Sequence, residues 1–169
     1  MPELYKSRIC NVLLAEDDED DFHFFNIAIS SLDGMYQLLR ISDGVMFSSL
    51  IQTSIDPDII FLDINMPYKD GIACLKEIRS HEGYNSIKVV MYSTSNNVKE
   101  IDRCYSMGAD FYLIKPPCYL CIQQQLMELF QNDYFVKNIK PPREEFVFHS
   151  AKFHTKEGNY HFNHRPAFA

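Results

Sequence analysis

Apolar residues gather in short runs that alternate with stretches of helical periodicity over the first 130 residues of the chain. The runs predict strands of four to seven residues at 11–16, 36–41, 59–62, 87–93 and 110–115. Between them, apolar positions repeat at intervals of three and four residues. This spacing predicts helices at 21–32, 44–53, 71–80, 98–108 and 119–130.

This fivefold alternation of strand and helix indicates one fold class. Consecutive units of this kind form a parallel sheet whose two faces are covered by helices. The run 59–62 supports the arrangement because it is apolar without alternation, as a strand buried on both faces should be. We therefore expect an α/β fold with a doubly wound, five-stranded parallel sheet. In such sheets, ligands bind outside the carboxyl ends of the strands.

Polar and charged side chains stand where four of these runs end. They are Glu16 and Asp17, Asp63, Ser93 and Thr94, and Lys115. Because the sheet is parallel, these ends meet at one edge, where three carboxylates would repel one another. A hard divalent cation relieves that repulsion. Mg²⁺, which prefers carboxylate, carbonyl and water oxygens, is the expected cofactor.

Asp63 is the central residue of this group, because a carboxylate beside a core strand is costly unless something pairs with it. A carboxylate neutralised by Mg²⁺, next to Lys115 and a hydroxyl, is equipped to accept a phosphoryl group. The acidic residues at positions 18–21 are different. They begin the first predicted helix, where negative charge is favourable, and we assign them no ligand role.

Composition and charge narrow the class of protein. The 169 residues are 46% hydrophobic, which fits one domain with an appendage. Residues 1–130 carry a net charge of −9, and this argues against binding of nucleic acid. No apolar run is long enough to span a membrane and the N-terminal residues show no signal-peptide core, so a cytoplasmic protein is expected.

The five cysteines are an odd number in a chain large enough to form a core without disulfides, so reduced thiols are expected. Cys118 and Cys121 have C-x-x-C spacing. With no second pair to complete a zinc site, we interpret them as helix residues, with a redox or metal role as the minor alternative.

Four motifs, each at the end of a predicted strand, together resemble the receiver domain of two-component response regulators. They read LLAEDD, IIFLDINMP, VVMYSTS and GADFYLIKPP. The resemblance covers residues 9 to about 130 and is to the stand-alone, single-domain type. It implies a flavodoxin-like fold and a phosphorylation-dependent switch that signals by protein contact.

The resemblance also implies roles for the acidic residues. Asp63 matches the aspartate that accepts a phosphoryl group from a sensor histidine kinase or a histidine phosphotransfer protein. Asp17 matches the carboxylate that binds Mg²⁺ directly, and Glu16 its neighbour that acts through water. Asn65 lies two residues past the acceptor, where the backbone carbonyl completes the metal site.

Roles for the remaining site residues follow from the same resemblance. Lys115 matches the lysine that pairs with the phosphate, and Tyr112 matches the aromatic switch. Ser93, 22 residues before Lys115, matches the switch hydroxyl. The next residue is small in the family but is Thr94 here, so Thr94 competes for that role.

We expect no enzymatic activity beyond self-phosphorylation and autodephosphorylation. One alternative is an intermediate in a phosphorelay. Another is a phosphohydrolase of the haloacid-dehalogenase type, which uses an aspartate nucleophile on a similar fold. That family has a second aspartate two residues after the first, and Asn65 at this position argues against it.

Residues 131–169 form an extension that matches no output domain. They hold eight of the 23 Phe and Tyr residues and four of the six histidines, which is unlike a disordered tail. The stretches 145–149 and 159–163 alternate like two strands around a turn. We expect the extension to pack on the receiver or on a second copy in a homodimer. The alternative is an idle extension.

Overall fold

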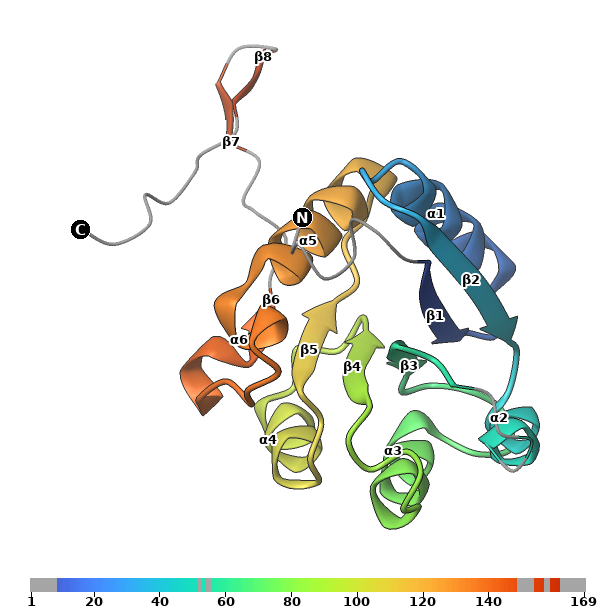
Figure 1. Cartoon of the computed structure of the whole chain (residues 1–169). Helices are drawn as coiled ribbons and strands as arrows, with labels where there is room; N and C mark the ends of the chain where they lie inside the picture. Colours follow the sequence, from blue (N-terminus) through green and yellow to red (C-terminus); the bar gives the residue numbers. More distant parts are fainter. Residues whose placement is uncertain (1–8, 52, 54–55, 149–153, 157–158, 162–169) are drawn as a thin grey trace.

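The computed structural model describes residues 9–51, 53, 56–148, 154–156 and 159–161, and its main body is a parallel six-stranded sheet (Figure 1). In chain order the strands are β1 (Cys10–Ala15), β2 (Tyr36–Ile41), β3 (Ile59–Asp63), β4 (Lys88–Ser93), β5 (Phe111–Ile114) and β6 (Val147–Phe148). Their order across the sheet is β2-β1-β3-β4-β5-β6. The predicted doubly wound sheet is confirmed for β1 to β5.

Helices cover both faces of the sheet. They are α1 (Glu19–Ser30), α2 (Gly44–Ile51), α3 (Gly71–Ser80), α4 (Val98–Ser106), α5 (Tyr119–Gln131) and the short α6 (Asp133–Val136). One hydrophobic cluster joins α1 and α5 to the sheet, and another joins α2, α3 and α4 to the opposite face. Figure 1 shows the same layers, with α1 beside α5.

The strand sequences explain these layers. In β1, Val12 and Leu14 contribute to the cluster with α1 and α5, whereas Leu13 and Ala15 contribute to the other cluster. Successive side chains of a strand point to opposite faces, so a strand with both faces covered must be apolar at every position. Because these strands pair in parallel, the carboxyl ends of β1, β3, β4 and β5 lie at one edge of the sheet, as the sequence predicts.

The C-terminal return segment, residues 132–148, brings the chain back along the sheet. It contains α6, a 3₁₀ turn at Arg143–Glu145, and β6, which pairs in parallel with β5. Phe135 and Phe146 are 1% and 0% exposed, and Tyr112 N donates a hydrogen bond of 2.9 Å to Phe146 O. The sheet therefore has one strand more than predicted. The stretch 145–149, which alternates like a strand, contains β6, but local alternation does not indicate that it pairs with β5.

A separate hairpin pairs β7 (His154–Lys156) with β8 (Asn159–His161) in antiparallel fashion. Each of the two stretches that alternate like strands contains one, β6 within 145–149 and β8 within 159–163, but they do not pair with each other, because β6 pairs with β5 and β8 with β7. Residues 149, 162 and 163 lie outside the described residues.

Cys118 and Cys121 are joined by a disulfide, so the expectation of reduced thiols was wrong for this pair. The reason is local geometry. Cys118 is the N-cap of α5 and Cys121 lies in its first turn, which brings their Cα atoms to 5.4 Å, within the range that a disulfide spans.

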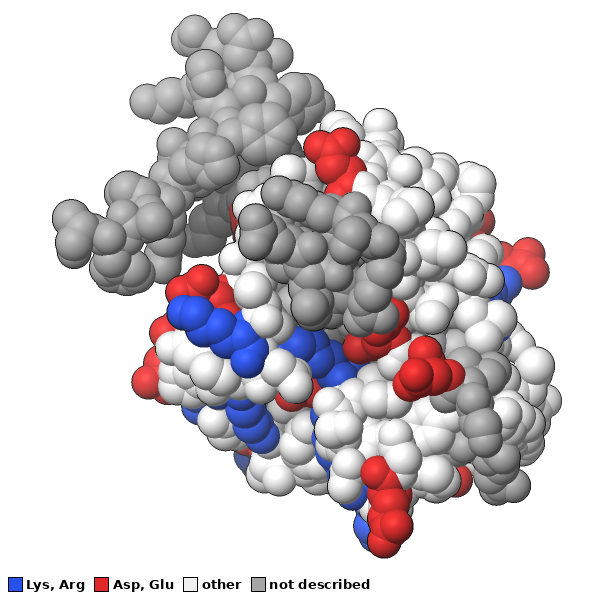
Figure 2. All heavy atoms as spheres, in the orientation of Figure 1, with Lys and Arg blue, Asp and Glu red and all other residues white. Residues whose placement is uncertain are grey.

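Two further observations concern the apolar length of the helices and the charges on the surface. Within the described residues, no helix is long and apolar enough to cross a membrane. Figure 2 shows acidic and basic side chains lying near one another on the face in view.

Candidate functional site

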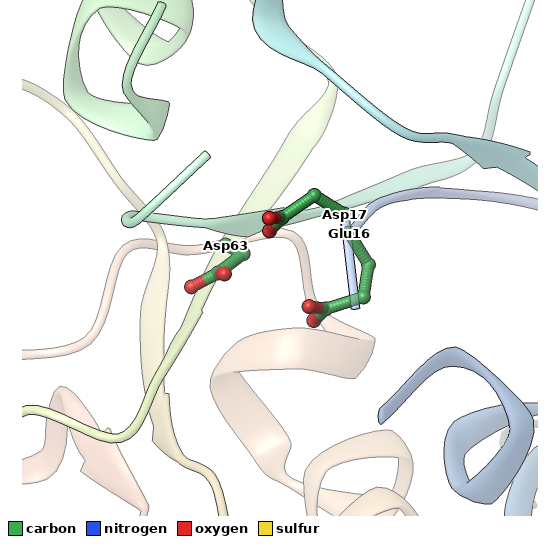
Figure 3. A group of neighbouring side chains, drawn as sticks. All are labelled: Glu16, Asp17 and Asp63. Carbon is green, nitrogen blue, oxygen red and sulfur yellow. The ribbon is translucent and has the colours of Figure 1, made fainter. Parts of the chain in front are cut away.

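Three carboxylates meet at the carboxyl edge of the sheet. Glu16 and Asp17 follow β1, and Asp63 is the last residue of the adjacent strand β3. One oxygen of each lies within 4.8 Å of the others, and Figure 3 shows the three side chains gathered at this edge. The parallel pairing of β1 with β3 therefore produces the cluster that the sequence predicts.

Asp63 is buried, with 5% of the residue exposed. Burial raises the pKa of its carboxyl group, against the opposing effects of Lys115 and of the Asn65 backbone N–H. That N–H donates to Asp63 Oδ1 at 3.3 Å. Asn65 itself is exposed, two residues beyond the strand.

The helix that follows packs tightly against this strand end. Gly71, the first residue of α3, donates its N–H to Ile64 O at 3.0 Å. A Cβ at Gly71 would lie 2.0 Å from the carbonyl oxygen of Asp63, so only glycine permits the approach.

Glu16 is completely buried, unlike the exposed Asp17. Burial raises the pKa of Glu16 to about 7, although Lys115 acts in the opposite direction. Its Oε2 lies 2.7 Å from Lys115 Nζ, and its Oε1 accepts a 3.3 Å hydrogen bond from Asp18 N. Glu16 therefore holds the lysine in place while Asp17 stays open to solvent.

Lys115 joins the carboxylates of three different elements. Its Nζ is 2.7 Å from Glu16 Oε2, 2.7 Å from Asp21 Oδ2 and 3.4 Å from Asp63 Oδ2. Burial alone would lower its pKa, but the surrounding carboxylates, Asp63 first among them, raise it above the usual value for lysine. The lysine is a fixed positive charge facing Asp63.

Asp21 was missed by the sequence analysis, which placed it with the helix-start charges. Asp18 is the N-cap of α1 and accepts hydrogen bonds from Asp20 N and Asp21 N, at 2.8 and 3.0 Å. This cap leaves the Asp21 carboxylate free to reach Lys115. The usable signal was its position three residues after the cap, one helical turn beyond the acidic strand end.

Arg40 is a second residue that the sequence analysis missed. From β2 it donates through Nε to Glu16 O at 3.1 Å and through Nη2 to Asp17 O at 2.9 Å. It thereby fixes the backbone that carries both carboxylates. Its position near the end of the strand beside β1 was the available clue.

The predicted hydroxyls take two different positions. Ser93 is completely buried, and its Oγ accepts a 3.2 Å hydrogen bond from Ser95 N. Thr94 is exposed and lines a cavity of about 370 Å³ together with Lys115. Which of the two is the switch hydroxyl stays a prediction.

Tyr112 is turned inward from β5 and is 0% exposed. Its hydroxyl lies 2.9 Å from Ser95 O and 3.0 Å from Glu100 Oε1. The side chain therefore contacts both the loop after β4 and the helix α4. It connects the site to the face on which the return segment packs.

The donor set fits a hard divalent cation. Glu16, Asp17 and Asp63 supply oxygen ligands at adjacent strand ends, and one lysine cannot neutralise these carboxylates together with Asp21. Hard cations such as Mg²⁺ take this kind of ligand and retain waters. These three residues would hold the ion.

Comparison with known proteins agrees with this geometry. A family model described as "Response regulator receiver domain" matches residues 12–131. Response regulator Rcp1 of Synechocystis sp. is 28% identical over 126 residues, covering 71% of this chain and 81% of Rcp1. The two-component response regulator-like protein APRR9 of Arabidopsis thaliana is 29% identical over 109 residues. This match covers 64% of the chain but 23% of APRR9.

Solved structures give the same result. The Mn²⁺-bound form of Rcp1 has a TM-score of 0.66 at 26% identity, covering 73% of this chain and 95% of that one. The phosphorylated cyanobacterial phytochrome response regulator RcpA has a TM-score of 0.67 at 26% identity, covering 73% and 94%. The chain belongs to the response regulator receiver domain family, and its function is that of a phosphorylation-dependent switch in two-component signalling.

Proposed function

We propose that Asp63 accepts a phosphoryl group from a phosphohistidine on a sensor kinase or phosphotransfer protein, with Mg²⁺ as the cofactor. One observation carries this proposal. A buried Asp63 carboxylate lies 3.4 Å from Lys115 Nζ, and the oxygens of Glu16 and Asp17 are within 4.8 Å of it. Phosphoryl transfer depends mainly on positioning and on neutralising charge, and this cluster supplies both.

In the transfer, an Asp63 oxygen attacks phosphorus while the bond from phosphorus to the donor nitrogen breaks. Lys115 balances the charge that accumulates on the phosphoryl oxygens. Glu16 and Asp21 hold the ammonium group at 2.7 Å each, so the charge is in place before the donor arrives. Bound Mg²⁺ would reduce the repulsion between Asp63 and the incoming phosphate.

The signal would leave the site through β4 and β5. A hydroxyl of Ser93 or Thr94 would bond to the new phosphoryl group, and Asn65 would offer its backbone carbonyl to the metal. Tyr112 hydrogen-bonds the loop that follows Ser93, so a shift of that loop changes the contacts of Tyr112 with α4. The output is then a change of surface that a partner protein reads.

Intact-mass spectrometry after incubation with Mg²⁺ and acetyl phosphate tests this function. We expect one added phosphoryl group, lost in Asp63→Asn and absent with EDTA. Asp33→Asn, an exposed aspartate outside the cluster, is the matched control and should be labelled like the parent. An addition that persists in Asp63→Asn would place the acceptor elsewhere. Continuous release of phosphate from unrelated phosphate esters would favour the phosphohydrolase alternative instead.

A further inference from the structure

The C-x-x-C pair at the start of α5 has no part in the proposed transfer. Cys118, the N-cap, is exposed, whereas Cys121 is 3% exposed and belongs to the buried side of the helix. One sulfur is thus open to solvent and the other is sheltered. Thiol–disulfide exchange needs one accessible sulfur, and here a small thiol can reach Cys118 and displace Cys121.

The pair lies near Lys115, the cation of the phosphoryl-acceptor site. Cys118 lines the same cavity of about 370 Å³ as Lys115, Thr94 and Asp21. Only two prolines, Pro116 and Pro117, separate it from Lys115 in the chain. Gln125 Nε2 also donates to Ile114 O at 3.0 Å, which fixes α5 to the end of β5. The start of α5 and the lysine are therefore mechanically connected.

The surroundings of the pair differ from those of the other cysteines. Cys118 has no side-chain capping bond, although Cys121 N and Ile122 N point to its carbonyl oxygen at 3.1 and 3.2 Å. A helix N-terminus and C-x-x-C spacing both favour the thiolate form. By contrast, burial raises the pKa of Cys74 to about 11 and that of Cys104 to about 12, which makes these thiols inert.

We propose that Cys118 and Cys121 are a reversible thiol–disulfide site, open to low-molecular-weight thiols and their disulfides, that controls phosphoryl acceptance from the edge of the same cavity. In reduction, a small thiolate attacks Cys118 Sγ and the bond between the two sulfurs breaks. Cys121 leaves as a thiolate and takes up a proton. A second small thiolate then releases Cys118 and forms the small-molecule disulfide, so two electrons pass to the protein pair.

Control of phosphoryl acceptance rests on the proposed function and follows from charge. The disulfide has no ionisable group, whereas a Cys118 thiolate places negative charge in the cavity that Lys115 lines, and Lys115 Nζ lies 3.4 Å from Asp63. One extra charge several ångströms from the reacting phosphate changes a rate by about twofold in water, and by more where water is excluded. We expect the oxidised protein to accept phosphate about two to three times faster than the reduced protein.

The first experiment tests the redox pair independently of phosphorylation. The full chain is equilibrated at a series of ratios of reduced to oxidised glutathione, quenched with N-ethylmaleimide and weighed intact. We expect a maleimide on the exposed Cys118 at reducing ratios and none at oxidising ratios, reversibly. The buried Cys10, Cys74 and Cys104 serve as internal controls and should stay unlabelled. Labelling of Cys118 at every ratio, or at none, would overturn the proposal.

The second experiment compares the rate of labelling by acetyl phosphate in the oxidised and reduced proteins at one Mg²⁺ concentration. The double variant Cys118→Ser/Cys121→Ser is the control and should give one rate under both conditions. If the oxidised and reduced forms of the parent protein are labelled at equal rates, the cysteine pair does not regulate phosphoryl acceptance. No labelling of either form would refute the proposed function, and the glutathione series still reports on the pair separately.

Discussion

Replacement of Phe146 by alanine tests whether the return segment is part of the receiver core. Phe146 is completely buried and stacks edge-to-face on Tyr105 of α4, with ring centroids 5.0 Å apart. It also lies 6.3 Å, centroid to centroid, from Tyr112. The hydrogen bond from Tyr112 N is accepted by the backbone oxygen of Phe146 and does not involve its side chain, so the substitution removes packing and leaves the backbone pairing.

The expected loss is large for a residue outside the five-strand core. A buried phenylalanine removes at least about 150 Å² from water, which at about 25 cal/mol per Å² is about 4 kcal/mol. Measured Phe→Ala substitutions in cores cost about 3–5 kcal/mol. With a urea dependence of about 2 kcal/mol per M, the unfolding midpoint should fall by about 2 M.

Equilibrium urea unfolding followed by circular dichroism measures this effect. Ile139→Ala is the matched control, because Ile139 lies in the same segment but is 53% exposed. It should change stability by less than about 0.5 kcal/mol. If Phe146→Ala also stays within about 0.5 kcal/mol of the parent, the return segment contributes nothing to the core and the reasoning fails.

Three further predictions concern the site. Gly71→Ala puts a Cβ 2.0 Å from the carbonyl oxygen of Asp63 and should cost about 1–3 kcal/mol in urea unfolding and slow phosphorylation. Gly83→Ala, where the Cβ meets the His81 ring at 3.4 Å, should do neither, and equal losses in both variants would contradict the argument. In EDTA, the free energy of unfolding should fall by up to about 3 kcal/mol as pH rises from about 4.5 to about 7. The sign follows because the folded protein keeps a proton on Glu16, whose pKa is raised to about 7, more tightly than the unfolded chain. If the free energy of unfolding of Glu16→Gln depends on pH as steeply as that of the parent, Glu16 is not the group responsible. Mg²⁺ at 100 times its dissociation constant should stabilise the parent by about 2.7 kcal/mol in thermal unfolding, and an equal gain in Asp63→Asn would exclude Asp63 as a ligand.

Hydrophobic periodicity and the order of elements along the sequence were sufficient to predict the parallel sheet and the edge at which the acidic residues meet. The apolar run of β3 predicted a strand covered on both faces, and the repeated units predicted a parallel sheet. Once the sheet is parallel, residues after β1 and β3 must share an edge. The proximity of Asp17 and Asp63 followed without knowledge of any side-chain conformation.

Features that depend on side-chain direction or on long-range pairing could not be obtained in this way. Asp21 serves Lys115 because Asp18 takes over the capping of α1, a choice between neighbouring acids that spacing does not reveal. Arg40 reaches across from β2 to backbone carbonyls that any sequence would offer. The pairing of β6 with β5 depends on the packing of Phe146 against Tyr105 and Tyr112, which lie far from it in the chain, and the local alternation at 145–149 could not indicate that partner.

Pairing with β6 also decides what kind of recognition the β5 side of the sheet permits. A long exposed edge strand invites another chain to add its own strand through backbone hydrogen bonds, the route to edge-to-edge aggregation. Here the outermost strand on that side has two residues and follows the Pro141–Pro142 pair by a single 3₁₀ turn. A partner protein that binds on this side therefore contacts side chains, including the Arg143–Asp102 ion pair, and not a long row of free backbone groups. The return segment therefore makes recognition on this side of the sheet depend on side chains, which differ between proteins, and not on backbone hydrogen bonds, which any extended peptide can form.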